Sequence, residues 1–508
     1  MDAEDIIKDL EKTEQKIEKR QEKIIKWLKN PYNAAFAGIL VFALIIRLYY
    51  FFLTKDQTVW WDAAEYMNMA KAWAFGLEYE FLPVRPVLFS LVIAGFLKIA
   101  NNEFLPRAFL LIISMGSVLG IYFLGKEMFN KKIGLIASLL MSVFYLNIFF
   151  TNRVLVDLPS LTFYSFSAFL FYKYFKTNSK SSLYWAAAVL AIGILFKLPT
   201  ISLALVVFIY ILITQRLSFI KKKEIWIAAL IFLLVLSPYL IWGYMKFGGF
   251  VITQAGAWNA PAKGTLLSTA FNNMKSYFSQ FKTYLSWPLL ISFLLGLALM
   301  YKVVLGFDVL LKGNKKLKRD FYLLLIFLIP IILVSFSLAH IENRYILNSF
   351  PAIFIISGVF MLKAYNFIKQ YKKFLAVLFL IIILGSITYF QLQYTDSLIK
   401  SKKGSYSQVR EAGLWLKGNT SPPDIIVTKS RPQIKYYSER EVIRIPDTKE
   451  EFEKELASNS DIKIYMVSIF ENHLEWTYSY AQENNLTPIK VYFAGPNQEQ
   501  ATLIIYRL

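Results

Sequence analysis

The chain of 508 residues contains no cysteine and only two histidines, His340 and His473. Without cysteine, disulfides, thiolate metal sites and cysteine nucleophiles are excluded. Two histidines are also too few for a zinc site built from several imidazoles. The N-terminal segment has no apolar run followed by a small-residue cleavage site, which argues against a removable signal peptide.

Apolar residues are abundant instead. Hydrophobic residues make up 56% of the chain and aromatic residues 17%, so the main solvent of this chain is expected to be lipid. The formal net charge of +21 could suggest a nucleic-acid partner. However, most basic residues fall in short loops between apolar runs, where they set the orientation of a membrane protein. We therefore expect a membrane protein with no nucleic-acid partner.

Apolar runs long enough to cross a bilayer, which takes about 20 residues each, follow one another along residues 34–393. They begin near Ala34, Leu105, Ile133, Leu158, Leu183, Pro199, Ile225, Tyr284, Phe321, Ile346 and Phe374. The pattern predicts a mostly α-helical, polytopic transmembrane bundle of about eleven spans with additional juxtamembrane helices.

Residues 86–100 are apolar but short, and the distribution of loop cations indicates how they lie. If this segment does not cross the bilayer, every large Lys/Arg cluster faces the cytoplasm, as the positive-inside rule requires. The clusters begin at Lys126, Lys173, Arg216, Lys312 and Lys369. We therefore predict a half-inserted helix at 86–100, a cytoplasmic N-terminus, an extracytoplasmic C-terminus and a plasma-membrane location.

Three regions are predicted. Residues 1–31 form a charged amphipathic helix on the cytoplasmic surface, with a coiled-coil contact as the alternative. Residues 32–398 form the transmembrane domain, and residues 399–508 form an extracytoplasmic α/β domain for acceptor docking or structural support. Its strands are predicted at 424–429, 462–470, 489–495 and 501–507, and its helices at 449–458 and 474–484.

The predicted orientation places the unusual polar residues on the outer face. Asp62 and Glu65 lie three residues apart after the first span, so on a helix both carboxylates project from one side. Arg153 and Asp157 lie at the next outer loop, where charged groups are kept for pairing or for function because burial is costly. Ordinary surface acids and a structural Arg153–Asp157 ion pair are the alternative interpretations.

More cations are expected on the same face. Lys197 precedes Pro199 at the outer end of a span, and Arg85 precedes Pro86. Arg47 lies near the outer end of the first span and could extend to the lipid headgroups. The last outer loop contains the sequence His340, Ile341, Glu342, Asn343, Arg344 and Tyr345.

These acids and cations converge while the chain lacks a signature for a soluble nucleotide. The combination favours a sugar donor whose phosphate is attached to a lipid. Arginine and lysine can hold the phosphate, and arginine offers the better forked geometry. A carboxylate can then accept the proton of an attacking hydroxyl group.

The order of short motifs is specific enough to suggest a family. D-x-x-E-Y, R-P, R-x-x-x-D-x-P, K-x-P and E-N-R-Y follow one another within residues 34–393. This order resembles the GT-C membrane glycosyltransferases of the protein O-mannosyltransferase and aminoarabinose-transferase type, which are family 39-like. The resemblance implies a GT-C type bundle and transfer of a sugar from a polyprenyl-phosphate or dolichyl-phosphate carrier to a hydroxyl of a protein, lipid or glycan.

The resemblance also implies residue roles. Asp62 and Asp157 correspond to the catalytic acids of the two outer loops, and Asp62 is expected to be the general base of an inverting displacement. Glu65 is the third expected catalytic residue, but Ala63 occupies the second position of the usual Asp-Glu pair, so Glu65 could orient its neighbours, bind a metal or the sugar, or be a surface acid. The expected phosphate ligands are Arg344, Lys197 and Arg85, and the expected surrounding residues are His340, Glu342, Tyr345, Arg153 and Tyr66.

Three alternatives remain open from the sequence. A divalent metal ion held by Asp62 and Asp157 could assist the reaction. An oligosaccharyltransferase-like enzyme would use a glycan on a lipid diphosphate instead. A lipid flippase or transporter would place its charges near the bilayer midplane and would consist of inverted halves.

Overall fold

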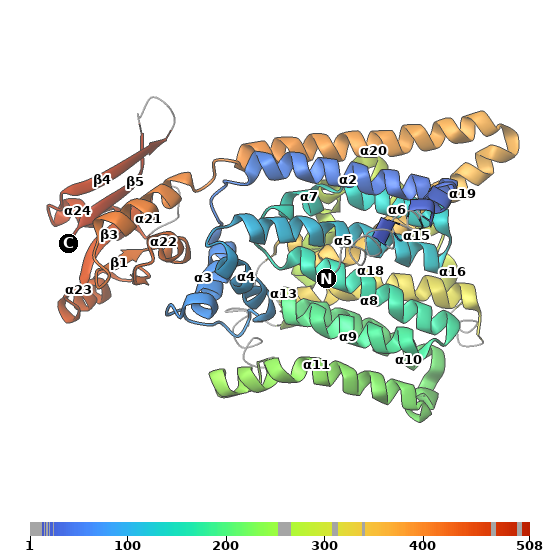
Figure 1. Cartoon of the computed structure of the whole chain (residues 1–508), viewed down its shortest axis with the longest axis horizontal. Helices are drawn as coiled ribbons and strands as arrows, with labels where there is room; N and C mark the ends of the chain where they lie inside the picture. Colours follow the sequence, from blue (N-terminus) through green and yellow to red (C-terminus); the bar gives the residue numbers. More distant parts are fainter. Residues whose placement is uncertain are drawn as a thin grey trace, which may run out of the picture.

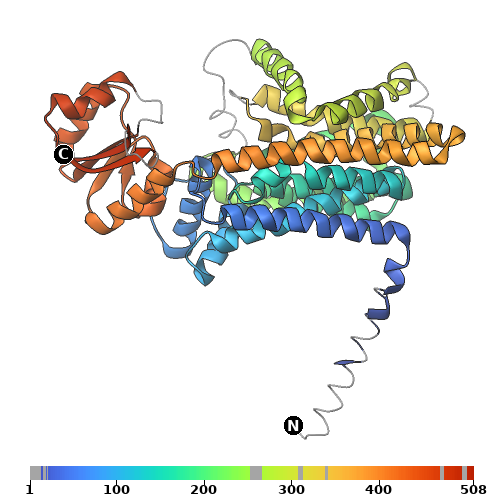
Figure 2. The same ribbon diagram turned by 90° about the horizontal axis from the view of Figure 1, so that it is seen from above.

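The computed structural model describes residues 13, 14, 16, 19, 21–23, 25–251, 266–306, 313–337, 341–468, 474–494 and 500–508. Most of the helix predicted at 1–31 lies outside these residues, as does His340. Long helices run side by side in one bundle, and a small sheet domain extends beyond one end of it (Figures 1 and 2). The predicted mostly α-helical bundle with a C-terminal α/β domain is confirmed.

The bundle is built from apolar helices of 7 to 30 residues that pack through their buried faces. They are α2 (Pro31–Thr54), α5 (Phe104–Met128), α6 (Lys131–Val143), α7 (Tyr145–Thr151), α8 (Asp157–Thr177), α9 (Lys180–Phe196), α10 (Ser202–Gln215), α11 (Lys223–Phe247), α15 (Trp287–Ala298), α18 (Lys315–Ser337), α19 (Phe350–Tyr371) and α20 (Lys373–Lys402). Shorter connecting helices are η1 (Leu198–Ile201), η2 (Arg216–Lys221), α13 (Leu266–Ser279), α14 (Phe281–Tyr284), α16 (Tyr301–Leu305) and η3 (Asn343–Ser349).

Length and composition qualify seven of the described helices as membrane spans, or eight if α6 and α7, bent by 54°, count as one. The prediction of about eleven spans is larger. The difference arises at α8, which is rich in Ser, Thr and Tyr, and at α9 and α15, which are only 17 and 12 residues long. Apolar runs in the sequence thus correspond to helices, but some of these helices do not meet the requirements for a span.

Two short helices lie between the bundle and the sheet domain, α3 (Trp61–Phe75) and α4 (Leu88–Ile99) (Figure 1). The 12 residues of α4 span about 18 Å, well short of the roughly 30 Å of the bilayer's hydrocarbon core. This length agrees with the prediction that residues 86–100 do not cross the membrane.

Arg47 holds α2 against its neighbours from inside the bundle. Its side chain is fully buried, and it donates hydrogen bonds to Ser114 Oγ at 2.9 Å, to the Ser142 carbonyl at 3.2 Å and to Asn147 Oδ1 at 2.6 Å. The expectation that Arg47 could extend to the lipid headgroups is therefore wrong. Buried polar partners on α5, α6 and α7 satisfy its donors instead.

The C-terminal domain contains a five-stranded sheet of order β2-β1-β3-β5-β4. Its strands are β1 (Ile425–Thr428), β2 (Val442–Ile443), β3 (Ile462–Ser468), β4 (Pro488–Ala494) and β5 (Gln500–Arg507). β1 pairs with β2 and β3 in parallel, whereas β5 pairs with β3 and β4 antiparallel. The short apolar runs in the sequence correctly predicted four of these strands but not the two-residue β2.

The helices of this domain are α21 (Ser407–Asn419), α22 (Arg431–Ser438), α23 (Lys449–Ser458) and α24 (Glu475–Glu483). The sequence predicted α23 and α24 but not α21 and α22. The predicted domain boundary at 398–399 lies inside α20, which continues to Lys402.

α22 attaches the C-terminal domain to α3. Asn68 donates to the Pro432 carbonyl at 2.7 Å, and the Lys71 ammonium group contacts Glu439 at 2.7 Å. The backbone N–H of Val59, just before α3, donates to the Tyr437 hydroxyl at 2.9 Å. The helix that carries Asp62 is therefore fixed from the side of the C-terminal domain.

Candidate active site

The local structure of α3 determines where its two acids point. The helix begins at Trp61, so Asp62 lies in its first turn, where the partial positive charge of the helix terminus favours a carboxylate. Glu65 lies about one turn later on the same side. Gly76, with φ of 72°, ends the helix in the left-handed conformation that glycine adopts without strain.

Asp62 is held by two arginines that are distant from it in the sequence. Arg85 Nη2 lies 2.8 Å from Asp62 Oδ1, and Arg344 Nη2 donates to the other carboxylate oxygen. The three side chains are between 14% and 25% exposed, so solvent screens these ion pairs only partly. The structure thus brings Asp62, Arg85 and Arg344 together, as the sequence predicted.

This environment determines the charge of Asp62. Burial alone would raise the pKa of its carboxyl group, but the positive charges and hydrogen bonds of Arg85 and Arg344 outweigh burial and lower the pKa well below its usual range. Asp62 is therefore ionised at neutral pH. While both guanidinium groups remain in place, it is a weak proton acceptor.

Asp157 forms a second ion pair beside the first. Lys197, at the end of α9, donates from Nζ to Asp157 Oδ1 at 2.6 Å. Arg344 Nη1 lies 3.9 Å from Asp157 Oδ2, an atom that is buried without a hydrogen bond. One guanidinium group therefore lies between the carboxylates of Asp62 and Asp157.

Arg153 does not take part in this arrangement. It donates to the Phe149 carbonyl at 2.6 Å, and its guanidinium group lies 4.1 Å from the Trp60 ring centre and 3.5 Å from that of Phe149. The alternative interpretation of an Arg153–Asp157 ion pair is wrong, because the chain turns between them and Asp157 pairs with Lys197.

Glu342 and Tyr345 position Arg344. Arg344 Nε donates to Glu342 Oε2 at 2.6 Å, and the Tyr345 hydroxyl donates to Glu342 Oε1 at 3.1 Å. The Lys197 ammonium group lies 5.2 Å from the Tyr345 ring centre. Glu342, just before η3, and Tyr345, within η3, therefore support the cations on both sides of Asp157.

Glu65 has a different partner, which the sequence did not reveal. The Tyr79 hydroxyl donates to Glu65 Oε2. Tyr79 lies in the segment after α3, where neither periodicity nor a motif marked it. Burial raises the pKa of Glu65, although Arg85 and the Tyr79 hydrogen bond oppose this effect. Tyr66 is buried, and the Arg85 guanidinium lies 5.1 Å from the Tyr66 ring centre.

The opposite pKa shifts predict opposite effects on stability. The raised pKa of Glu65 means that its charged form costs folding free energy at pH values above the folded-state pKa. This cost disappears below the unfolded pKa of about 4.3. Glu65→Gln is therefore expected to raise the melting temperature in detergent at pH 7 but not at pH 4. A lower melting temperature at pH 7 would contradict this account.

The partners of the acidic side chains bear on the metal site that the sequence suggested. Among the described residues, no three His, Asp or Glu side chains come together as metal ligands. Both Asp62 oxygens contact guanidinium groups, and Asp157 contacts Lys197. In the described structure the carboxylates of Asp62, Asp157 and Glu342 thus have Arg85, Lys197 and Arg344 as their partners.

Comparisons with known proteins agree with the resemblance inferred from the motifs. Residues 84–242 match the family model described as dolichyl-phosphate-mannose-protein mannosyltransferase. An uncharacterised protein of Aquifex aeolicus is 27% identical over 328 residues, which cover 64% of this chain and 70% of that protein.

Two solved structures share the fold over most of the chain. ArnT from Cupriavidus metallidurans bound to undecaprenyl phosphate superposes with a TM-score of 0.62 at 13% identity, covering 93% of this chain and 97% of ArnT. The oligosaccharyltransferase AglB from Archaeoglobus fulgidus, in complex with an inhibitory peptide and a dolichol-phosphate, gives 0.59 at 13% identity, covering 87% of this chain and 70% of AglB. The chain is a multi-pass membrane protein with the fold of the GT-C glycosyltransferases.

Proposed function

We propose that this protein transfers a sugar from a polyprenyl phosphate to a hydroxyl group of an acceptor. The observation that supports this most directly is the position of Arg344 between Asp62 and Asp157, with Arg85 and Lys197 beside them. The ligands bound in the ArnT and AglB structures, undecaprenyl phosphate and dolichol-phosphate, are consistent with a lipid-linked donor here.

The cations would hold the phosphate of the donor. Arg344 and Arg85 offer forked hydrogen bonds, and Lys197 adds a point charge. When the sugar leaves, negative charge develops on the phosphate oxygen. Preorganised cations stabilise that charge without further rearrangement.

Asp62 would act as the base once the phosphate has bound. A phosphate that takes hydrogen bonds from Arg344 or Arg85 releases one Asp62 oxygen and weakens the field that lowers its pKa. The acceptor oxygen then attacks the anomeric carbon while the bond from that carbon to the phosphate oxygen breaks. The phosphate keeps the bonding electrons, and Asp62 accepts the hydroxyl proton. This single displacement inverts the configuration at the anomeric carbon.

The membrane side of the reaction follows from the loop charges. The clusters that begin at Lys126, Lys173 and Lys369 lie at the C-terminal ends of α5, α8 and α19. The active-site residues Asp157 and Arg344 lie at or just before the N-terminal ends of α8 and α19. Because basic clusters usually face the cytoplasm, this separation favours an extracytoplasmic active site. The plasma membrane, a cytoplasmic N-terminus and an outward-facing C-terminal domain remain part of this proposal.

The choice between a monophosphate and a diphosphate donor tests the proposal. Membranes containing the protein are incubated with radiolabelled sugars on polyprenyl monophosphate and on polyprenyl diphosphate, with membranes lacking it as the control. Consumption of a monophosphate donor with label in an acceptor is expected. Use of the diphosphate alone would instead support the oligosaccharyltransferase-like alternative, and movement of unchanged lipid across the bilayer without transfer would support a flippase.

A further inference from the structure

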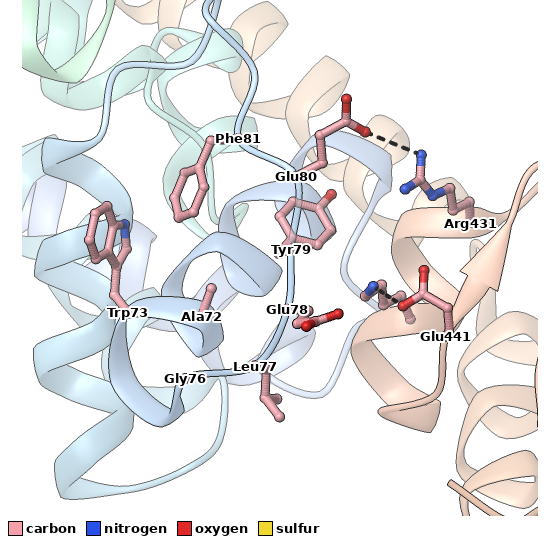
Figure 3. A pocket seen from close by; sticks show the side chains of 11 residues that line it. Ala72, Trp73, Gly76, Leu77, Glu78, Tyr79, Glu80, Phe81, Arg431 and Glu441 are labelled. Carbon is pink, nitrogen blue, oxygen red and sulfur yellow. Dashed lines mark hydrogen bonds and ion pairs between the residues drawn. The ribbon is translucent and has the colours of Figure 1, made fainter. Parts of the chain in front are cut away.

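A cavity of about 500 Å³ lies where the segment after α3 meets α22 of the C-terminal domain (Figure 3). Its lining includes Trp73, Glu78, Tyr79, Phe81, Arg431 and Glu441. The volume falls within the roughly 300–1,000 Å³ that is usual for small-molecule sites. The ion pairs of Asp62 and Asp157 described above involve none of these residues.

Aromatic rings form one side of this cavity. Figure 3 shows Trp73 and Phe81 together, with Arg431 and Glu441 on the opposite side. The Trp73 and Phe81 ring centres are 5.0 Å apart, and both rings pack against Trp242 at 6.0 Å and 5.7 Å. Because Trp242 packs against both rings, they offer a stable apolar surface to a ligand.

Charged side chains form the remainder of the lining. Arg431 lies 3.7 Å from Glu80, and Lys435 lies 2.6 Å from Glu441, while Glu78 is exposed. Three carboxylates against two cations leave a net negative charge, which disfavours a phosphate group. Carboxylates that accept hydrogen bonds, beside an aromatic surface, suit a ligand with an apolar face and several hydroxyl groups.

Tyr79 connects the cavity to the proposed active site. Its side chain lines the cavity (Figure 3), and its hydroxyl donates to Glu65, one helical turn after Asp62. The positive charges of Arg431 and Arg85 both act on Glu65. The Tyr79–Glu65 hydrogen bond therefore joins the cavity to α3, the helix that carries Asp62, and the charges of Asp62 and Arg85 act on Glu65.

We propose that this cavity binds the headgroup of the acceptor, which is a hydroxyl-rich sugar unit. The inference rests on the proposed function and adds the acceptor's chemical class and its place of binding. The headgroup stacks on Trp73 and Phe81 and donates hydroxyl hydrogen bonds to the carboxylates. Tyr79 and Glu65 are positioning residues that orient the acceptor side of the site toward Asp62.

The absence of cysteine makes a blocking experiment specific. In a Glu78→Cys chain the new thiol is the only one, so a bulky maleimide reacts at the cavity alone. Arg444→Cys supplies the matched control, because Arg444 is 71% exposed in the C-terminal domain and does not line this cavity. Each labelled variant is compared with its own unlabelled form.

Two measurements are made on each variant. Transfer is followed as radiolabel that moves from the polyprenyl-phosphate sugar to acceptors in a membrane extract. Donor-site integrity is followed as the rise in melting temperature caused by undecaprenyl phosphate. Labelling of Glu78→Cys is expected to reduce transfer about tenfold or more, since the reagent excludes the acceptor, and to leave the thermal shift intact. Labelled Arg444→Cys is expected to retain both.

The outcomes separate this inference from the function on which it rests. Transfer by labelled Glu78→Cys at its unlabelled rate would overturn the cavity assignment alone. Loss of both transfer and the thermal shift would assign the cavity to the donor and would also overturn it. Absence of transfer by the unmodified chain from every donor would overturn the proposed function, and this inference with it.

Discussion

An Asp62→Asn chain is expected to insert and to bind undecaprenyl phosphate, yet to transfer sugar about 10² to 10⁴ times more slowly, the range for loss of a general base. The amide cannot accept the acceptor proton. It also removes the Asp62 counter-charge from Arg85 and Arg344, so the melting temperature at pH 7 falls. Single-turnover transfer with saturating donor measures the chemical step.

Asp320→Asn is the matched control for this substitution. Asp320 also pairs with an arginine, Arg319, at 2.7 Å and has a similarly sheltered side chain. It lies near the beginning of α18, whereas Arg344 follows the end of that helix. Asp320→Asn is expected to keep its transfer rate. Full activity of Asp62→Asn would exclude Asp62 as the base.

The stability effect of Asp62 has a defined pH dependence. Because its pKa is lowered in the folded state, the stability it contributes is fully present above its unfolded pKa of about 3.9 and is lost as the pH falls through the folded-state pKa. The difference in melting temperature between the original chain and Asp62→Asn should therefore be large at pH 7 and should decrease in strong acid.

Arg344→Gln is expected to reduce transfer about 10² to 10³-fold, as when one charge-stabilising donor is removed from an active site. The glutamine leaves both Asp62 and Asp157 with fewer cationic contacts and removes a ligand of the donor phosphate. The thermal shift caused by undecaprenyl phosphate should also decrease. Arg344→Lys keeps the positive charge but loses the paired hydrogen bonds of the guanidinium group, so an intermediate loss of transfer is expected.

Arg319→Gln provides the matched control for Arg344. It removes a guanidinium group of comparable exposure that also pairs with an aspartate, but near the opposite end of α18. Both measurements should then remain close to those of the original chain. An equal loss in Arg319→Gln and Arg344→Gln would indicate general destabilisation instead of a donor-binding role.

The residues of the candidate site could be found from the sequence because each lies near the end of an apolar run. Asp62, Arg85, Asp157, Lys197 and Arg344 were placed on one face by the alternation of membrane crossings. The structure brings them into contact. Their chemical roles remain predictions, since no contact within the protein distinguishes a base from a structural counter-ion.

Other features could not be predicted, for identifiable physical reasons. Arg153 turns away from Asp157 because its guanidinium group packs between Trp60 and Phe149. Tyr79 lies in a non-periodic segment, so nothing in the local sequence indicated its bond to Glu65. The sequence located the apolar helices, but three of the predicted spans, α8, α9 and α15, do not pass the test of length and composition that seven or eight of the described spans pass.

The attachment of α22 to α3 limits how this protein can diverge or be recombined. Asn68 donates to the backbone carbonyl of Pro432, and the Lys71 ammonium group pairs with the Glu439 carboxylate just after α22, so the side chains at positions 71 and 439 are coupled although they are far apart in the chain. A hybrid that takes its C-terminal domain from a distant relative should need the matching α3 as well. Surveys of natural variants should accordingly find compensating pairs of substitutions across this junction.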